Sequence, residues 1–227
     1  MNHFLCIETA TEVCSVAIKR SDEQIFAEDN QIKNSHTESI TLQVKSCLER
    51  SGLHLHQICA IGISIGPGSY TGLRVGTSAA KGLALGAGIP LIGLNTLQGI
   101  AETCRGRALE NDIIIPMLDA RRMEVYYSIY DHKIRALHPI SNMIVADDCL
   151  DKLSSKGKIW VCGNGAWKIQ NFKSSERIEV FESQCSAIHH FPECEAKFKR
   201  KEFLDLAYFE PNYFKSPNIT SPKNQKL

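Results

Sequence analysis

The sequence has almost no net charge, with 26 Lys and Arg against 25 Asp and Glu among 227 residues. A charge balance this even argues against a protein that binds nucleic acid mainly through its own charge. No uninterrupted apolar run approaches the roughly 20 residues of a membrane helix. The segment Met1–Glu8 also lacks the charged start of a secretory signal. We therefore expect a cytoplasmic protein with no membrane partner.

Familiar metal-binding patterns are missing too. The zinc-protease motif His-Glu-x-x-His is absent. His36 opens a predicted helix, but position 40 is isoleucine, so a helical His-x-x-x-His metal pair cannot form there. The segment Cys185–Cys194 gathers two Cys and two His at spacings that match no common zinc module. We interpret it as packing or a loop and predict no metal site.

The nine cysteines are an odd number in a chain too long for a small disulfide scaffold. We interpret them as buried free thiols in a reducing compartment. The chain also offers no catalytic triad that residue spacing can support.

The order of apolar runs and turns predicts an α/β fold with an internal repeat. The elements expected in the first half are strands at 4–7, 13–19 and 24–27, a helix from 35 to 52, a strand at 58–65, a helix at 71–86 and a strand at 89–94. The second half opens in the same way, with strands at 113–118 and 123–130, a helix near 146–153 and a strand at 159–162. Both hairpins place an acid at the end of their first strand, Glu8 and then Asp119.

A glycine-rich turn, Gly66–Gly72, joins the strand at 58–65 to the following helix. Such a turn can hold phosphate, because free amides and the helix dipole point at the ligand. However, the Gly-Lys-Ser/Thr of a phosphate loop is missing, and the glycine spacing misses the dinucleotide fingerprint. By pattern alone, a structural tight turn is the preferred interpretation.

Gly72, Gly76 and Ala80 stand four residues apart along the predicted helix. Each internal glycine costs a helix about 1 kcal/mol relative to alanine, so close approach by another element should offset that cost. Two alternatives stay open: packing on the protein's own sheet, and contact with a partner helix. In the second case Gly76→Arg should abolish partner binding and leave the monomer folded.

Two polar segments mark the end of the chain. The basic run Lys197–Lys201 is interpreted as a solvated helix face, with contact to RNA phosphate or an acidic partner as the alternative. The residues from Lys215 are polar and include Pro217 and Pro222, so we predict that the tail 217–227 is disordered.

Six segments in order resemble the TsaB family, also called YeaZ. They are Ile7–Glu12, His36–Ser39, Gly66–Gly76, Lys81–Gly86, Asp119–Tyr126 and Glu210–Phe214. The long glycine-rich block is the most specific of them, whereas 174–201 matches no pattern of the family. The resemblance implies the two-lobed actin/Hsp70/sugar-kinase (ASKHA) ATPase fold with a shortened second lobe. The first lobe would span 1–105 as βββαβα, joined by 206–216, and the second lobe would span 106–205.

The resemblance also implies a role. A TsaB-like chain is a non-catalytic subunit that supports a TsaD-like threonylcarbamoyltransferase in forming threonylcarbamoyladenosine in tRNA next to the anticodon. A TsaE-like ATPase would be a further partner, tRNA would be contacted mainly through the complex, and the chain alone could form a homodimer. TsaD holds its metal with a helical His-x-x-x-His pair, and Ile40 stands here at the second ligand's position. Without that metal, an enzyme of this design cannot polarise the acyl carbonyl.

Two groups of site residues follow from the resemblance. The partner-binding group lies on the two helices and contains His36, Glu38, Ile40, Thr71, Gly72, Arg74, Val75, Gly76, Ala79 and Ala80. The nucleotide-binding group contains Glu8, Thr9, Gly163 and Gly165, for ATP or ADP at a weak or shared site, and the chain would need no cofactor of its own. Two departures weaken the case for ATP hydrolysis, because the family often has Asp in place of Glu8 and Gly-Asp-Gly in place of Gly163-Asn164-Gly165.

Two other functions stay open. A small sugar-kinase-like phosphotransferase would need a catalytic carboxylate, a Mg²⁺ carboxylate and a full adenosine pocket, and it would turn over ATP by itself. A glycoprotease-type peptidase would need a nucleophile with its base, and it would cleave partner proteins at defined sites.

Overall fold

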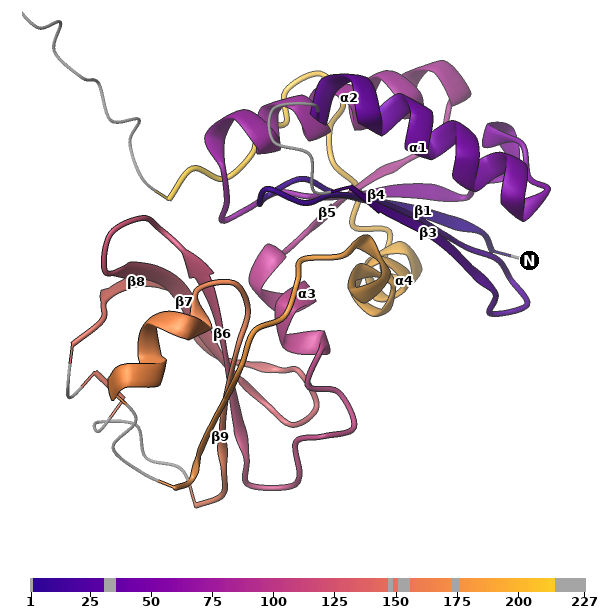
Figure 1. The fold of residues 1–227 in the computed structure, drawn as a ribbon. Coiled ribbons are helices and arrows are strands. Elements are labelled where there is room, and N and C mark those ends of the chain that lie inside the picture. Colours follow the sequence, from indigo (N-terminus) through magenta and orange to yellow (C-terminus); the bar gives the residue numbers. More distant parts are fainter. Residues whose placement is uncertain (1, 31–35, 147–148, 151–155, 173–175, 215–227) are drawn as a thin grey trace, which may run out of the picture.

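The computed structural model describes residues 2–30, 36–146, 149–150, 156–172 and 176–214, and of residues 36–38 and 171–172 it describes the backbone alone. Figure 1 shows two β-sheets, one in each lobe, with most of the helices around the first sheet. In the described part of the chain no helix is both long and apolar enough to span a membrane.

The first sheet is built from five strands in the order β3-β2-β1-β4-β5. The strands are β1 (Phe4–Glu8), β2 (Cys14–Lys19), β3 (Ile25–Asn30), β4 (Ala60–Ser64) and β5 (Leu91–Leu94). β1 pairs antiparallel with β2 and parallel with β4. Every residue of β1 and β4 is buried, as expected for central strands that are covered on both faces.

The second sheet has the order β10-β9-β6-β7-β8. The strands are β6 (Ile113–Asp119), β7 (Glu124–Asp131), β8 (Ala136–Ile144), β9 (Ile159–Cys162) and β10 (Ile178–Phe181). As in the first sheet, three antiparallel strands are followed by two strands that run parallel to the first of them. The two-lobed α/β fold that was predicted from the sequence is thereby confirmed.

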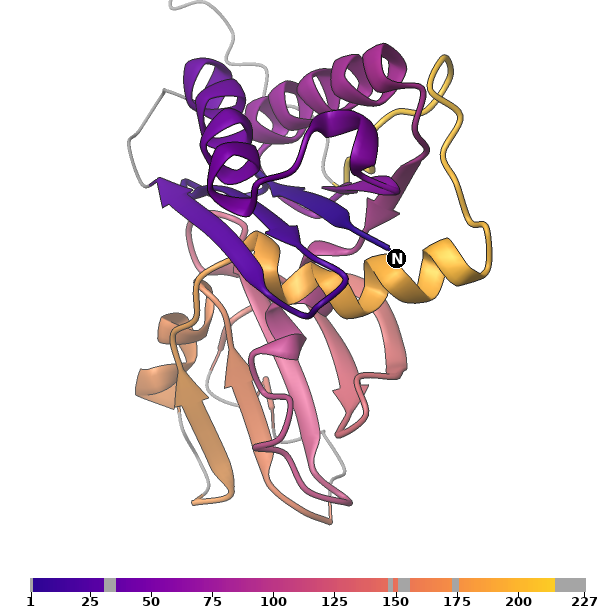
Figure 2. The ribbon, with the colours of Figure 1, turned by 90° about the vertical axis from the view of Figure 1, so that its right-hand side faces the viewer.

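Helices cover both faces of the first sheet (Figures 1 and 2). The helices α1 (His36–Ser51) and α2 (Tyr70–Ala87) lie side by side on one face, and α4 (Phe191–Lys199) runs beneath the other. The short α3 (Thr96–Glu102) lies between the two lobes and packs against β6. Among the described residues there are also three 3₁₀ segments, η1 (Leu55–Gln57), η2 (Ala166–Phe172) and η3 (Ala187–His190).

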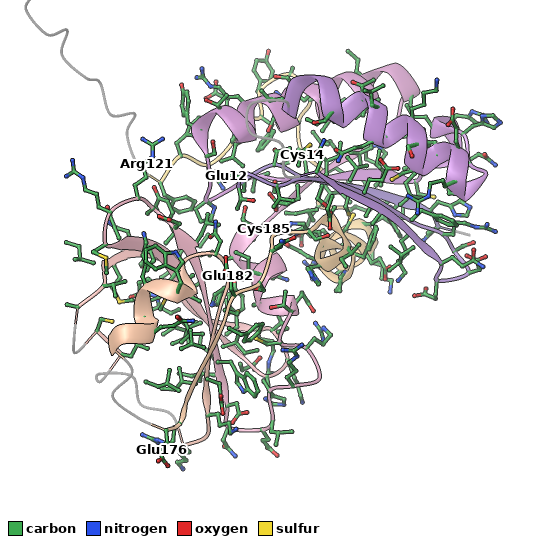
Figure 3. The ribbon with its side chains drawn as sticks, in the orientation of Figure 1. Glu12, Cys14, Arg121, Glu176, Glu182 and Cys185 are labelled. Carbon is green, nitrogen blue, oxygen red and sulfur yellow. The ribbon has the colours of Figure 1, made fainter. Side chains whose placement is uncertain are left out.

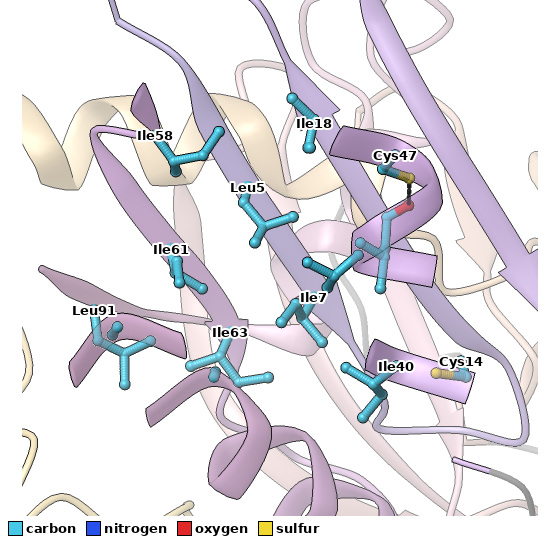
Figure 4. Close-up of a cluster of buried hydrophobic side chains, with 14 residues drawn as sticks. Leu5, Ile7, Cys14, Ile18, Ile40, Cys47, Ile58, Ile61, Ile63 and Leu91 are labelled. Atoms are coloured by element: carbon cyan, nitrogen blue, oxygen red, sulfur yellow. Dashed lines mark hydrogen bonds between the residues drawn. The ribbon is translucent and has the colours of Figure 1, made fainter. Parts of the chain in front are cut away.

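The main core lies between the first sheet and the α1–α2 layer (Figure 4). Leu5 and Ile7 of β1 meet Ile61 and Ile63 of β4 there, and all four side chains have no exposed surface. Burial of such a side chain stabilises the fold by roughly 1.5–3 kcal/mol. Ile40 of α1 enters the same cluster, so α1 is held on the sheet by its apolar side.

Several elements were not predicted from the sequence. These are α3, β8, β10 and the 3₁₀ segments η1, η2 and η3, and of α4 the sequence indicated a helix face only at the run Lys197–Lys201. Of the helix predicted near 146–153, residues 149–150 form a turn and Ala146 is not helical, while the others lie outside the described residues, as does the tail 217–227. α4 contacts β1 and β5, so the chain already lies against the first sheet before 206–216. The lobe boundaries themselves stay a prediction.

Candidate functional site

The acid that ends β1 is sealed inside the protein. Glu8 has no exposed surface, and its Oε2 lies 2.7 Å from Nε2 of His190. The amide of Ala10 donates to the other carboxylate oxygen at 2.5 Å. His190 is 1% exposed and arrives from η3, which was not predicted from the sequence. Both oxygens of Glu8 are thus engaged within the chain.

The repeat places Asp119 at the equivalent end of β6, where it is exposed but has contacts to one of its carboxylate oxygens. Lys168 Nζ lies 2.6 Å from Asp119 Oδ1, although the lysine is only 2% exposed. The same lysine donates to the carbonyl of Glu124 at 2.9 Å. The amide of Arg121 also donates to Asp119 Oδ1, at 2.6 Å. Each strand-end acid therefore has a basic side chain of the same protein as its partner.

The four predicted nucleotide-binding residues are all buried. Thr9 has no exposed surface, and no partner is recorded for its Oγ1 among the described residues. A Cβ on Gly163 would lie 2.4 Å from the carbonyl oxygen of Met117, and one on Gly165 would lie 3.0 Å from the amide of Asp119. These glycines therefore serve the close packing of the turn after β9 against β6. Nucleotide binding at Glu8, Thr9, Gly163 and Gly165 stays a prediction.

The small-residue stripe of α2 faces the protein's own sheet. A Cβ on Gly72 would lie 2.1 Å from the carbonyl oxygen of Thr9, and one on Gly76 would lie 2.1 Å from Thr9 Oγ1. Ala80 has no exposed surface. The close approach that offsets the helical cost of these glycines is therefore intramolecular. Gly76→Arg is therefore expected to unfold the monomer rather than leave it folded, because an arginine there would collide with Thr9 and Ile63.

The predicted partner-binding residues divide into an inner and an outer set. Ile40, like Gly72, Gly76 and Ala80, is buried in the monomer, because both helices turn their apolar side to the sheet. Thr71 and Arg74 are exposed, Val75 and Ala79 are half-buried, and the side chains of His36 and Glu38 lie outside the described residues.

The exposed side of α1 and α2 holds residues that the sequence reasoning missed. Leu42 is 67% exposed and Leu85 is 73% exposed, and a Cβ on Gly82 or Gly86 would meet nothing within 4 Å. Ser78, Gly82 and Gly86 repeat at the same four-residue spacing as the buried stripe, half a helix away from it. This spacing is visible in the sequence and could have indicated a second stripe of small residues on the helix. We call the set Leu42, Arg74, Ser78, Gly82 and Leu85 the outer helical face.

The segment Gly62–Gly66 fits the Gly-x-Ser-x-Gly pattern of serine hydrolases, which the interpretation of the sequence wrongly counted as absent. Its serine, Ser64, is the last residue of β4 and has no exposed surface. The hydroxyl accepts a hydrogen bond from the amide of Thr9 at 3.3 Å. In a hydrolase this serine stands exposed on a sharp turn, so Ser64 does not have the geometry of a nucleophile.

The cysteines are free thiols, as predicted. Burial raises the pKa of Cys6, Cys162 and Cys185 well above the usual thiol value, which keeps these thiols protonated. Cys185 lies on the segment that leads from the second sheet to η3 (Figure 3). A hydrogen bond to Cys162 lowers the pKa of Cys104, but this side chain has no exposed surface. None of these four thiols is an accessible nucleophile.

The Cys/His segment 185–194 does not gather its side chains around one point. His190 contacts Glu8, whereas the thiol of Cys194 is hydrogen-bonded to the thiol of Cys6. Within the described ranges no group of three or more His, Cys, Asp or Glu is placed to hold a metal ion. In the basic run, Lys197 bonds Glu193 and the carbonyl of Gly93, and part of its charge is therefore balanced within the protein.

Known proteins share this architecture. YeaZ from Pseudomonas aeruginosa superposes with a TM-score of 0.77 at 20% identity, over 94% of this chain and 100% of that chain. A second Pseudomonas aeruginosa structure, of an uncharacterized protein with similarity to peptidase YeaZ, gives 0.78 at 21% identity, over 95% and 100% of the two chains. These likenesses establish the fold.

Sequence comparison decides the family. The family model "TsaD: tRNA N6-adenosine threonylcarbamoyltransferase" matches residues 28–221. The tRNA threonylcarbamoyladenosine biosynthesis protein TsaB of Bacillus subtilis is 31% identical over 157 residues, which are 68% of this chain and 67% of that protein. The chain belongs to the TsaB branch of this family. TsaB of Escherichia coli is 41% identical over 128 residues, but this match spans only about half of each protein, 56% of this chain and 54% of the relative.

Proposed function

We propose that this TsaB-family chain is a non-catalytic subunit that pairs with a TsaD-like threonylcarbamoyltransferase in forming threonylcarbamoyladenosine in tRNA. The names of its relatives and the match to the TsaD family model support this role. As further proposals we retain a TsaE-like ATPase as a second partner, a homodimer of the isolated chain, tRNA contact through the complex, ATP or ADP at a shared site, and a cytoplasmic location.

The observation that carries the non-catalytic role is the state of the two strand-end acids. Phosphoryl-transfer enzymes need carboxylates that hold Mg²⁺ and position the nucleophile. Here the side chains of His190 and Lys168 take those places at Glu8 and Asp119, at 2.7 and 2.6 Å. A further acid–base or metal role for Glu8 would require these contacts to open. This geometry favours a binding subunit over the phosphotransferase alternative.

The outer helical face is the surface that we assign to the TsaD-like subunit. Because the TsaD family model matches most of this chain, a TsaD-like protein should carry its own counterparts of α1 and α2. Two such helix pairs can pack against each other when small residues allow close approach and apolar side chains fill the centre. Gly82 supplies the open space, and Leu42 and Leu85 supply the exposed apolar surface.

Leu85→Glu should weaken binding to the TsaD-like subunit by about 10- to 100-fold, because it places a charge in the apolar centre of the interface. The monomer should stay folded, since Leu85 is 73% exposed. Isothermal titration calorimetry gives the affinity, and circular dichroism checks the fold. Leu137→Glu on β8, at a residue 60% exposed, is the matched control and should bind normally. Equal affinity of both variants and the wild type would reject this surface.

The function itself is tested by reconstitution. The TsaD-like subunit of the same cell, supplied with the threonylcarbamoyl adenylate and tRNA, should form the modified nucleoside only when this chain is present. The chain by itself should form none and should not turn over ATP. ATP turnover by the isolated chain would support the phosphotransferase, and defined cleavage of partner proteins would support the peptidase.

A further inference from the structure

After α4 the chain returns along the edge of the first sheet and passes beside α2 (Figure 1, yellow). We call residues 204–214 the C-terminal strap. Hydrogen bonds of its main chain attach it to the first lobe: Leu204 N donates to Leu91 O at 2.8 Å, Lys81 Nζ donates to Phe209 O at 2.6 Å, and Asn212 N donates to Ile65 O at 2.8 Å. The strap is therefore attached to the first lobe near its start, its middle and its end.

The glycine-rich turn before α2 is shaped to receive this strap. Gly66 has a φ of +114°, and a Cβ there would lie 2.7 Å from the carbonyl oxygen of Asn212. Only glycine combines this backbone conformation with so close an approach of another segment. One glycine of the block thus serves the docking of the strap.

Tyr213, the residue after Asn212, contacts the first lobe. Tyr213 Oη accepts a hydrogen bond from Arg74 Nε at 3.1 Å, and the Tyr213 ring lies 4.7 Å from the ring of Tyr70. The guanidinium carbon of Arg74 is 4.2 Å from the centre of the Tyr70 ring, within the range of a cation–π contact. Tyr213 therefore orders Arg74, which belongs to the outer helical face.

Phe214, the next residue, contacts the second lobe. The Phe214 ring lies 6.3 Å from the ring of Tyr126 at an interplanar angle of 58°, an arrangement that aromatic pairs favour. Tyr126 lies on β7 and is 8% exposed, so the surrounding side chains fix the position of its ring. Two consecutive residues of the strap thus contact opposite lobes.

We propose that Tyr213 and Phe214 form a clasp that holds the two lobes at one mutual angle. The clasp also links that angle to Arg74 on the outer helical face. This second statement rests on the proposed function, because it concerns binding of the TsaD-like subunit. Coupling of this kind is reciprocal, so a partner that binds the ordered Arg74 should also tighten the clasp.

The clasp is tested on the isolated chain by a distance measurement between the lobes. Labels are carried by unnatural amino acids at Glu49 on α1 and Lys133 after β7, both exposed, because the chain has nine cysteines. The double variant Tyr213→Ala/Phe214→Ala should broaden the distance distribution measured by pulsed electron paramagnetic resonance. Tyr208→Ala, at a residue of the same strap that is 86% exposed, should leave it unchanged. A distribution as narrow as the wild type's in the double variant overturns the clasp.

The coupling is tested with the TsaD-like subunit. Phe214→Ala should weaken its binding several-fold, and Tyr208→Ala should not. If the wild-type chain does not bind the TsaD-like subunit at all, the proposed function fails while the distance measurement still decides the clasp. If the wild type binds and Phe214→Ala binds equally well, the coupling is wrong although the proposed function stands.

Discussion

Replacing His190 with leucine is expected to lower the free energy of unfolding by about 3 kcal/mol, because it leaves a buried carboxylate oxygen without its hydrogen-bond partner. Glu8 has no exposed surface, and His190 Nε2 lies 2.7 Å from its carboxylate. After the substitution, the amide of Ala10 is the hydrogen-bond partner that the described part of the chain leaves to that carboxylate. Urea denaturation at neutral pH, followed by circular dichroism, measures the change.

A double-mutant cycle separates the pair from simple repacking. Glu8→Leu alone should also destabilise the chain, whereas the variant with both substitutions should recover much of the loss, because no polar group of the pair then stays buried without its partner. The exposed pair Lys158–Glu179, with side chains 53% and 41% exposed, is the control. Lys158→Ala should cost at most about 1 kcal/mol. If His190→Leu costs no more than Lys158→Ala, the buried pair does not stabilise the protein as proposed.

The second large effect is expected from one substitution at two positions of α2. Gly72→Ala should lower the free energy of unfolding by about 1–3 kcal/mol, because overpacking forces the backbone to move. The clash is with the main-chain carbonyl of Thr9 at 2.1 Å, which no side-chain rotation can relieve. Gly82→Ala should instead raise the free energy of unfolding by about 1 kcal/mol, since alanine is the better helix former. A Cβ on Gly82 meets nothing within 4 Å.

Thermal unfolding can resolve these opposite signs. For a chain of 150–250 residues, a change of 1 kcal/mol moves Tm by about 2–4 °C. We therefore expect a lower Tm for Gly72→Ala and a higher one for Gly82→Ala, with the wild type between them. A stabilised Gly72→Ala variant would show that the stripe does not pack on Thr9. In that case the alternative, that the stripe contacts a helix of a partner protein, would be favoured.

Local features of the fold were predictable because they depend on neighbours in sequence. The hairpins at β1–β2 and β6–β7 follow from apolar runs separated by polar turns. The start of α2 follows from the Gly-Pro-Gly-Ser turn, although the helix begins at Tyr70 with Ser69 as its capping residue, one position before the predicted start at 71. The repeat of the hairpin then predicted two lobes.

The direction of the small-residue stripe was not predictable in the same way. A four-residue period places Gly72, Gly76 and Ala80 on one side of a helix, but it does not say what that side meets. The outer stripe Ser78, Gly82 and Gly86 has the same period. Only the packing of α2 on the first sheet decides which stripe is buried. Thr9 is the residue that packs against the buried stripe, at Gly72 and Gly76.

By itself, the sequence determined the hairpins that open each lobe, the first two helices and the family, because each of these is written in residue type and spacing along the chain. Tertiary structure decided the chemistry of the strand-end acids. Glu8 and His190 are 182 positions apart, and no local pattern links them. Whether a carboxylate is free to hold an ion or is already paired depends on what the fold brings against it. A buried charge requires such a partner, and the fold supplies His190 from η3, an element that the sequence did not predict.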